Sequence, residues 1–433
     1  MRPALGGWLP DRDRCAVMSA RTTHLDLATA RRLAVRAQLL SGPAPTVTTD
    51  GVKQVLRAVR CLQLDPINAV VPSHLLVLWS RLGNFDRAHL DRLLWVDRWL
   101  FEYWAHAASI VLTEDYPLHA GTMRRYPGPS AYGTRVRQWL EANSKLRAHV
   151  LRRLAQAGPL PSGGFDDLAE VPWESTGWTG GRNVERMLEH LLLQGRVMVA
   201  GRTGRGRLWH LAEQCLSEEQ RGPSLPDRVI VVRAAEHALR ALGVASKAEI
   251  RRHFTRDRYP GLESALRELE NAGRIVRVTV ETIAEPMYAH ADELGNTVWQ
   301  PRTVVLSPFD NLVCDRDRTQ RLWRFRFRNE MYQPRAKREF GYYVMPLLRG
   351  ECLVGRIAAR VDRRSRALTV EGLYAEPGAP ADDACRHDLR QAIEGLAHFA
   401  GATGIAIAGP VASAWRGVLR GKEMPAGPTA AAL

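Results

Sequence analysis

The segment Gln63-Leu64-Asp65-Pro66 places an amide and a carboxylate two residues apart. The residue before a proline is biased toward extended geometry, and side chains at i and i+2 of an extended segment point to the same side. Gln63 and Asp65 can therefore converge while Leu64 points into the core. A carboxylate can stabilise a developing positive charge or deprotonate water, and an amide can hold that water with its donor and acceptor groups.

A second interpretation of Asp65 is structural. Aspartate caps free N–H groups at helix starts, and proline fits the first helical position because its missing N–H costs nothing there. Asp65-Pro66 alone is therefore typical of a helix opening. The two roles are compatible, because one carboxylate oxygen could bind a backbone N–H and so fix the other.

Length and charge limit the protein class. The chain has 433 residues, of which 45% are hydrophobic and 25% charged, so we expect several globular domains. Its formal net charge of +15 comes mostly from arginines spread along the chain. This excess favours a polyanionic partner, above all nucleic acid. The alternative is a high-GC genome, which raises arginine content without any functional demand.

Cysteine spacing and hydropathy indicate a reduced, non-membrane environment. The six cysteines form no C-x-x-C pair and no Cys/His cluster with zinc spacing, so we expect neither a metal nor another cofactor. No apolar run is long enough to span a bilayer, and the N-terminus lacks a signal-peptide core. We expect a cytoplasmic, nucleoid-associated protein whose first residues form a disordered leader, or whose true start is Met18.

Helical periodicity followed by a hairpin signal recurs along the chain. Residues 145–157 and 181–194 are predicted helices, and the apolar runs VMVA and LWHLA then flank a Gly/Arg turn. Helices followed by a hairpin are typical of a winged helix, a variant of the helix-turn-helix. The order returns after residue 231, where Ser246 and Glu249 form a capping box and GRIVRVTVE supplies a wing strand.

From residue 284 the composition favours strands, with one helix at 381–399. We expect an α+β fold with these parts in chain order: a disordered leader (1–22), a winged-helix domain with the candidate motif (23–144), a winged-helix domain with the basic hairpin (145–226), a third winged-helix domain (227–283), a barrel-like β-rich domain (284–422) and a loose tail (423–433).

The predicted hairpin at 195–211 is strongly basic. It carries no acidic residue from 195 to 212, and its glycines allow close backbone approach. A hairpin of this kind can lie along a groove of duplex DNA and bind phosphates. The alternative is a solvated turn without function. The candidate phosphate contacts are Arg196, Arg202, Arg205 and Arg207.

Several ordered motifs share a resemblance. They are QLDPIN, SHLLVLWSRLG, LFEYWAHAAS, the 195–211 hairpin, and LSPFDNLVCDRDRTQRLW with PRAKREFGYYVMPLL and LVGRI after it. From about residue 24 to 420 the chain resembles the AlkZ/YcaQ family of winged-helix crosslink-repair DNA glycosylases. The resemblance implies three tandem winged helices, a C-terminal β-rich domain and a concave basic surface for double-stranded DNA.

The resemblance also implies a catalytic motif of glutamine, an apolar residue, and glutamine or aspartate. Here it is Gln63-Leu64-Asp65. Members with aspartate resemble the general-repair branch, and those with glutamine resemble toxin-resistance enzymes. Substrates would be alkylated purines of the N7-alkylguanine type, with interstrand crosslinks as further candidates. A charged N7-alkylguanine leaves readily, so the sugar, which gains oxocarbenium character, needs the carboxylate most.

No lysine lies in or beside this motif, and the nearest upstream is Lys53. We therefore expect a monofunctional glycosylase that uses water and leaves an abasic site. We also expect the protein to be a monomer. Family resemblance suggests an open site for bulky lesions. Residues that could lie near the lesion, unless they pack in the core, are His74, Tyr103, Trp104 and His106. Further candidate phosphate contacts are Arg81, for which the alternative is a structural contact, and Arg335, Lys337 and Arg338, for which the alternative is a basic surface without function.

Two other protein classes remain open at this stage. A DNA-binding regulator with a ligand-sensing β-domain explains charge and fold equally well, although it gives the Gln-x-Asp segment no role. A metal-dependent nuclease could use Asp315 and Asp317, but their arginine neighbours would oppose a divalent cation.

Overall fold

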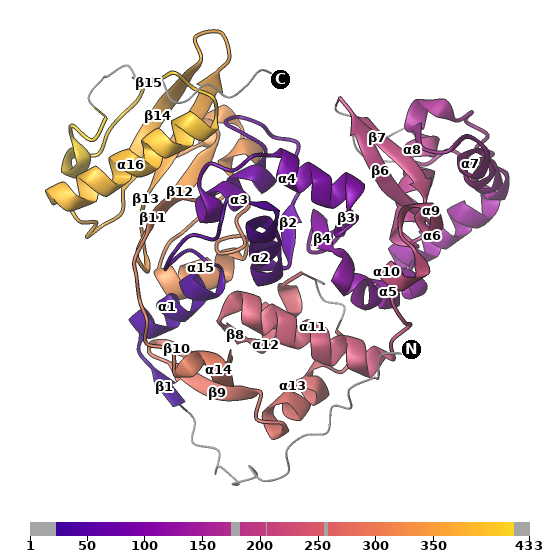
Figure 1. The fold of residues 1–433 in the computed structure, drawn as a ribbon, viewed down its shortest axis with the longest axis horizontal. Coiled ribbons are helices and arrows are strands. Elements are labelled where there is room, and N and C mark those ends of the chain that lie inside the picture. Colours follow the sequence, from indigo (N-terminus) through magenta and orange to yellow (C-terminus); the bar gives the residue numbers. More distant parts are fainter. Residues whose placement is uncertain (1–22, 175–181, 205, 255–258, 420–433) are drawn as a thin grey trace, which may run out of the picture.

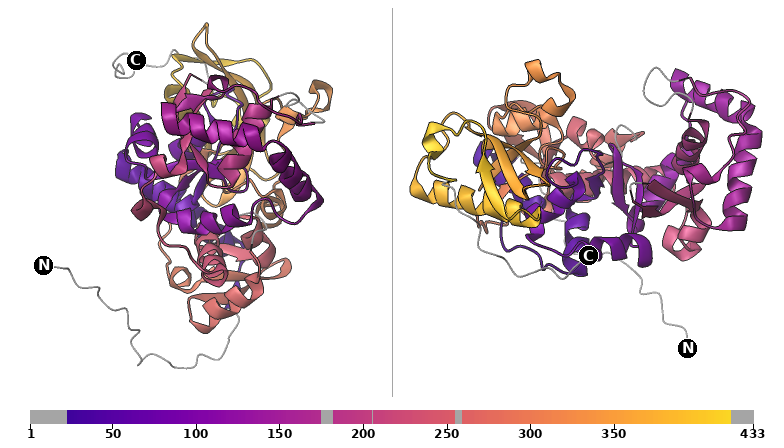
Figure 2. Two further views of the ribbon diagram at one scale, coloured as in Figure 1. Left: turned by 90° about the vertical axis from the view of Figure 1, so that its right-hand side faces the viewer. Right: turned by 90° about the horizontal axis from the view of Figure 1, so that it is seen from above.

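The structure is a computed structural model that describes residues 23–174, 182–204, 206–254 and 259–419. The expected leader, the expected tail and Arg205 lie outside these residues. Three helix-and-sheet units and a curled C-terminal sheet make up the fold (Figure 1). The second unit and the C-terminal sheet lie at opposite ends of the molecule, in Figure 1 and again from above in Figure 2.

The first unit places the candidate motif at the end of a short strand. Its sheet has the order β2-β4-β3. Arg60, in the left-handed conformation (φ 67°), ends the helix before β2, so the strand starts immediately. The sequence did not predict strands β2–β4. The elements are α2 (Thr49–Val59), β2 (Cys61–Gln63), α3 (Ser73–Leu82), α4 (Ala88–Asp91), β3 (Leu100–Trp104) and β4 (Ala108–Leu112).

The second unit contains the predicted basic hairpin, which is confirmed as β6 and β7. These strands join β5 in a sheet of order β5-β7-β6, and the two predicted helices before them are confirmed as α7 and α8. The elements are α5 (Tyr116–Arg125), α6 (Ala131–Ala142), α7 (Ser144–Ala157), β5 (Leu160–Pro161), α8 (Asn183–Leu193), β6 (Val197–Thr203), β7 (Gly206–Leu211), α9 (Ala212–Cys215) and α10 (Glu218–Arg221).

The third unit repeats the same order of helices and strands. The capping box of Ser246 and Glu249 is confirmed at the start of α12. Residues 23–37, which we assigned to the first domain, lie here instead, because β1 (Thr23–Leu25) pairs in parallel with β9 and α1 (Leu27–Ala37) packs on α11. The elements are α11 (Asp227–Leu242), β8 (Val244–Ser246), α12 (Lys247–Arg252), α13 (Leu262–Asn271), β9 (Ile275–Val280) and β10 (Ile283–His290).

The predicted C-terminal strands and helix are confirmed. The sheet runs β11-β12-β13-β14-β15, with its last pair parallel. Among the described residues β11 and β15 do not pair, so the sheet is curled but not closed into a barrel. The elements are α14 (Ala291–Leu294), β11 (Thr303–Val305), α15 (Arg316–Trp323), β12 (Val344–Arg349), β13 (Cys352–Asp362), β14 (Ala367–Ala375), α16 (Asp383–Phe399) and β15 (Gly404–Ile407).

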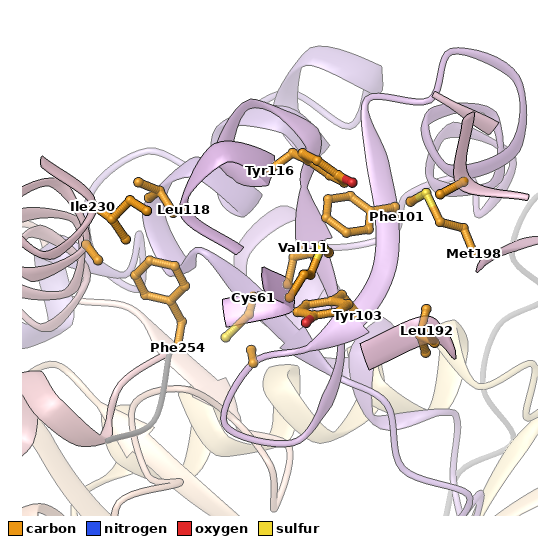
Figure 3. Packing of buried hydrophobic residues seen from close by; sticks show 14 of the residues in the cluster. Cys61, Phe101, Tyr103, Val111, Tyr116, Leu118, Leu192, Met198, Ile230 and Phe254 are labelled. Atoms are coloured by element: carbon orange, nitrogen blue, oxygen red, sulfur yellow. The ribbon is translucent and has the colours of Figure 1, made fainter. Parts of the chain in front are cut away.

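One hydrophobic core joins all three units. Figure 3 shows Cys61 and Tyr103 of the first unit in the same cluster as Leu192 of the second and Phe254 of the third. The expectation that Tyr103 contacts a lesion is wrong, because its side chain is only 2% exposed. Its hydroxyl donates to the carbonyl of Leu193, 3.1 Å away. Tyr103 therefore binds the first unit to the second.

A buried ion pair connects the first unit to the C-terminal domain. The guanidinium of Arg81 on α3 binds both carboxylate oxygens of Asp310, with Nη2 at 2.9 Å from Oδ1, and neither side chain is exposed. Its Nε also donates to the carbonyl of Gln38 (3.0 Å). The expectation that Arg81 contacts DNA phosphates is therefore wrong. Its charge is already compensated inside the protein.

Replacing Arg81 with methionine should strongly destabilise the fold. It would leave the Asp310 carboxylate buried without its partner, and breaking a buried pair in this way costs about 3–5 kcal/mol. Urea unfolding followed by tryptophan fluorescence would measure this loss. The matched control is Arg228→Met, which removes an exposed pair with Glu268 and should cost less than about 1 kcal/mol. Equal losses would contradict the structural role of Arg81.

Candidate functional site

The candidate motif leaves β2 as an extended segment and enters a tight turn. The amide of Leu64 continues the ladder by donating to the carbonyl of Ala108 (2.8 Å), and its side chain packs against the core, as expected. The expectation that Asp65-Pro66 opens a helix is wrong, because α3 begins only at Ser73. Between β2 and α3 the chain makes a turn, which brings α3 back against β2.

Asp65 holds this turn together. Its Oδ1 accepts a hydrogen bond from the backbone N–H of Ile67 (2.9 Å), which is the pattern of an Asx turn. The prediction that one carboxylate oxygen binds a backbone N–H is confirmed, although in a turn and not at a helix start. The side chain is half-buried. Its position is therefore fixed while part of it still faces solvent.

The second oxygen of Asp65 has a partner from a distant part of the chain. The hydroxyl of Tyr332, in a 3-10 turn at Glu330–Tyr332, donates to Oδ2 over 2.9 Å. The Tyr332 side chain is 61% exposed. Partial desolvation, the hydrogen bond to Asp65 and the charge of that carboxylate raise the pKa of Tyr332 to about 12. The phenol is thus a neutral donor at any physiological pH.

Gln63 is held by a histidine. Its Oε1 accepts from Nε2 of His106 (3.1 Å), so His106 carries its proton on that nitrogen, and Nδ1 faces the Cys61 sulfur at 3.6 Å. The backbone carbonyl of Gln63 accepts from the Ser73 hydroxyl (2.9 Å). Of the expected lesion-proximal residues, His106 thus lies directly beside the motif. Gln63 and Asp65 are each oriented, by different partners.

Strand β2 is anchored from the C-terminal domain. The side-chain amide of Asn311 donates to the carbonyls of Val59 (3.2 Å) and Cys61 (3.0 Å). Asn311 follows Asp310, the partner of Arg81, in the motif LSPFDNL. Two adjacent side chains of one loop therefore bind α3 and the backbone on either side of Arg60. They set the position from which the Gln63–Asp65 segment emerges.

Two other residues expected near the lesion, His74 and Trp104, differ in their surroundings. His74, in the first turn of α3, has a pKa lowered to about 4, mainly by burial and further by the charges of Arg202 and Arg87. It is therefore neutral at physiological pH. Trp104 ends β3 and is 41% exposed. His74 can offer a hydrogen bond, and Trp104 offers an exposed aromatic face.

The basic hairpin is clamped to the first unit. Arg202 binds the buried Glu102 of β3 with two hydrogen bonds, of 2.8 and 2.9 Å, and Arg207 approaches the same carboxylate to 3.6 Å. Arg98 donates to the carbonyl of Ala200 (2.8 Å). Two of the expected phosphate contacts are thus already paired with a carboxylate, whereas Arg196 is exposed.

The other expected phosphate contacts lie in the loop that follows Tyr332. Arg335 and Lys337 are exposed. Arg338 instead donates through Nε to the carbonyls of Glu330 (3.2 Å) and Gln333 (3.0 Å). Arg338 therefore shapes the loop that presents Tyr332 to Asp65.

Within the described ranges, no group of three or more His, Cys, Asp or Glu side chains is placed to hold a metal ion. None of the helices in those ranges is both long and apolar enough to cross a membrane.

Two comparisons relate this arrangement to known proteins. The model of the AlkZ-like DNA glycosylase family matches residues 56–399, which include the motif, the hairpin and most of the C-terminal domain. The solved structure of the Streptomyces sahachiroi DNA glycosylase AlkZ is similar in fold, with a TM-score of 0.60 at 14% identity. That match covers 90% of this chain and 100% of that chain.

Proposed function

This chain belongs to the AlkZ-like DNA glycosylase family and is a DNA glycosylase, and from that premise we propose that it releases N7-alkylated guanines from duplex DNA by hydrolysis at Asp65. Because its motif ends in aspartate, we place it in the general-repair branch, with interstrand crosslinks among its substrates. It acts as a monomer. The observation that carries the proposal is a half-buried carboxylate whose two oxygens are each oriented by a donor.

The chemistry follows from the charge of the substrate. An N7-alkylated guanine is already cationic and leaves without strong acid catalysis. The sugar gains positive charge as the bond breaks, and a fixed carboxylate near C1′ lowers the energy of that state because it needs no reorganisation. Gln63, oriented by His106, positions the water. Without a lysine in the motif, the enzyme is monofunctional and leaves an abasic site.

We further propose that the three units are winged helices that together grip the duplex. The support is their shared order of helix, strand, helices and hairpin, with a three-stranded core of order 1-3-2 in each. The β6–β7 hairpin, clamped at Glu102, probes a groove next to the lesion, and exposed Trp104 borders it. An open site of this kind admits a bulky base without rotating it into a tight pocket.

Tyr332 acts as a positioning residue for Asp65. Its neutral hydroxyl holds Oδ2 while the turn holds Oδ1, so the carboxylate cannot rotate away from the sugar. A hydrogen bond to a charged group contributes about 1.5–3 kcal/mol. Loss of the hydrogen bond between Tyr332 and Asp65 should therefore slow base release by a measurable factor.

Replacing Asp65 with asparagine should lower the single-turnover rate of N7-methylguanine release by about 10²-fold or more, because the shape remains and the charge is lost. DNA affinity should change little. Release of the methylated base from a duplex, with affinity measured by fluorescence anisotropy, checks both. Asp86→Asn is the matched control, because Asp86 is exposed and accepts from Ala88 in the same kind of turn (2.9 Å).

The proposal fails if Asp65→Asn releases base at the wild-type rate, or if Asp86→Asn loses as much activity. Trapping of the wild-type protein on DNA with borohydride would contradict the monofunctional mechanism, since it requires a Schiff base.

Replacing Tyr332 with phenylalanine should lower the same rate by about 10-fold or more, the equivalent of one charged hydrogen bond, with DNA affinity unchanged. In an Asp65→Asn background the substitution should add nothing. Tyr132→Phe on α6, also an exposed tyrosine, is the control, and a release rate of Tyr332→Phe equal to that of the wild type would exclude this role.

A further inference from the structure

The C-terminal domain carries a basic groove that takes no part in the chemistry proposed at Asp65. It has a volume of about 680 Å³ and lies between α15 and the segment 326–333. The basic and amide side chains that line it are Arg316, Gln320, Arg326, Arg328, Asn329 and Gln333. Asp317 is the one carboxylate of the lining, so three guanidinium groups face one acid. The groove therefore favours an anion with several charges.

The sequence of this segment places its arginines in a row. In Phe325-Arg326-Phe327-Arg328 the phenylalanines are buried and the arginines exposed, which is the alternation of an extended segment. Alternate residues of such a segment are roughly 6.5–7 Å apart. That separation is comparable with the separation of successive phosphates along one DNA strand, so the two arginines can each meet one phosphate.

These two arginines are not neutralised by the protein. Among the described residues, none forms an ion pair or a hydrogen bond with the guanidinium group of Arg326 or Arg328, although Arg356 donates to the backbone carbonyl of Arg326 (3.1 Å). Most nearby arginines differ: Arg321 pairs with Glu249 and Glu285 at 2.5 Å each, and Arg356 pairs with Glu376. An exposed and unpaired guanidinium keeps its full attraction for a phosphate.

Arg316, which belongs to the lining of the groove, is held in place by hydrogen bonds within the protein. Arg316 donates to Oδ1 of Asn329 (2.7 Å) and to the carbonyls of Pro308 (3.0 Å) and Val313 (2.6 Å). Its guanidinium also lies 4.3 Å from the centre of the Phe327 ring. Burial lowers the pKa of Arg316 to about 10, so it remains charged at physiological pH. Arg316 therefore adds a fixed positive charge to the lining that it shares with Arg326 and Arg328.

The lining of the groove ends one residue from the partner of Asp65. Gln333 belongs to its lining and follows Tyr332, whose hydroxyl binds the Asp65 carboxylate. A strand whose reacting sugar lies at Asp65 would therefore run its neighbouring phosphates past Gln333 and into the groove. The exposed Arg335 and Lys337 follow Tyr332 within five residues of the chain and add further positive charge.

We propose that this groove binds the sugar-phosphate backbone of the strand that carries the damaged base, with Arg326 and Arg328 each contacting one phosphate. The assignment to that strand rests on the proposed function of Asp65, whereas the phosphate contacts themselves do not. The groove thus holds the damaged DNA strand along its length, and the turn at Asp65 holds one sugar of that strand.

The test is the salt dependence of DNA binding by Arg326→Gln/Arg328→Gln. Each phosphate contact contributes about 0.9 to the slope of log K against log salt concentration for duplex DNA. The double variant should therefore lose about 1.8 of that slope and bind more weakly at low salt. The probe is an unmodified fluorescein-labelled duplex of about two helical turns, measured by anisotropy. Arg326→Lys/Arg328→Lys, which keeps both charges, should retain the wild-type slope.

Arg363→Gln/Arg364→Gln is the matched control. These exposed arginines lie in the turn between β13 and β14, and the variant loses the same net charge. Its slope should equal that of the wild type. If the groove variant keeps the wild-type slope, or the control loses as much, the groove proposal is wrong even if Asp65→Asn abolishes base release. A reduced slope in the groove variant together with full base release by Asp65→Asn would leave the phosphate contacts standing and overturn the role of Asp65.

Discussion

The position of the candidate site depends on one buried loop of the C-terminal domain. Asp310 neutralises Arg81 on α3 and Asn311 binds the carbonyls of Val59 and Cys61. Desolvating two charges is costly unless their geometry is good, so α3 and this loop have little freedom to separate. Strand β2 packs against α3 and is hydrogen-bonded to this loop, so its position is fixed as well. The turn at Asp65 therefore starts from a strand whose position is fixed.

The site is assembled from two parts of the chain that are 267 residues apart. The first unit supplies the carboxylate and the C-terminal domain supplies the hydroxyl that orients it. The core shared by the three units (Figure 3) sets the first unit against the others. The hairpin is in turn held to the first unit through Glu102. The candidate chemistry and the surfaces expected to meet DNA are thus one mechanical unit.

Local signals in the sequence predicted much of this fold, and long-range packing accounts for what they missed. Helical periodicity, the capping box at Ser246 and the strand-rich composition of the C-terminal domain were readable because their causes are local. Arg81 was misjudged because nothing near it reveals a carboxylate 229 residues away. Tyr103 was misjudged because an aromatic run has the same composition in a core as on a surface. Tyr332 carried no signal at all, since its partner is defined only by the folded chain.

The Glu102 clamp has a consequence for how such a protein can diversify. Because Arg202 and Arg207, which face each other one pair before the turn of the hairpin, both bind one buried carboxylate, the direction in which the hairpin points is decided just below its tip. Residues beyond the clamp can change in length and sequence without altering that direction. The turn alone could therefore vary between related chains, while Asp65 and the residues that orient it stay unchanged.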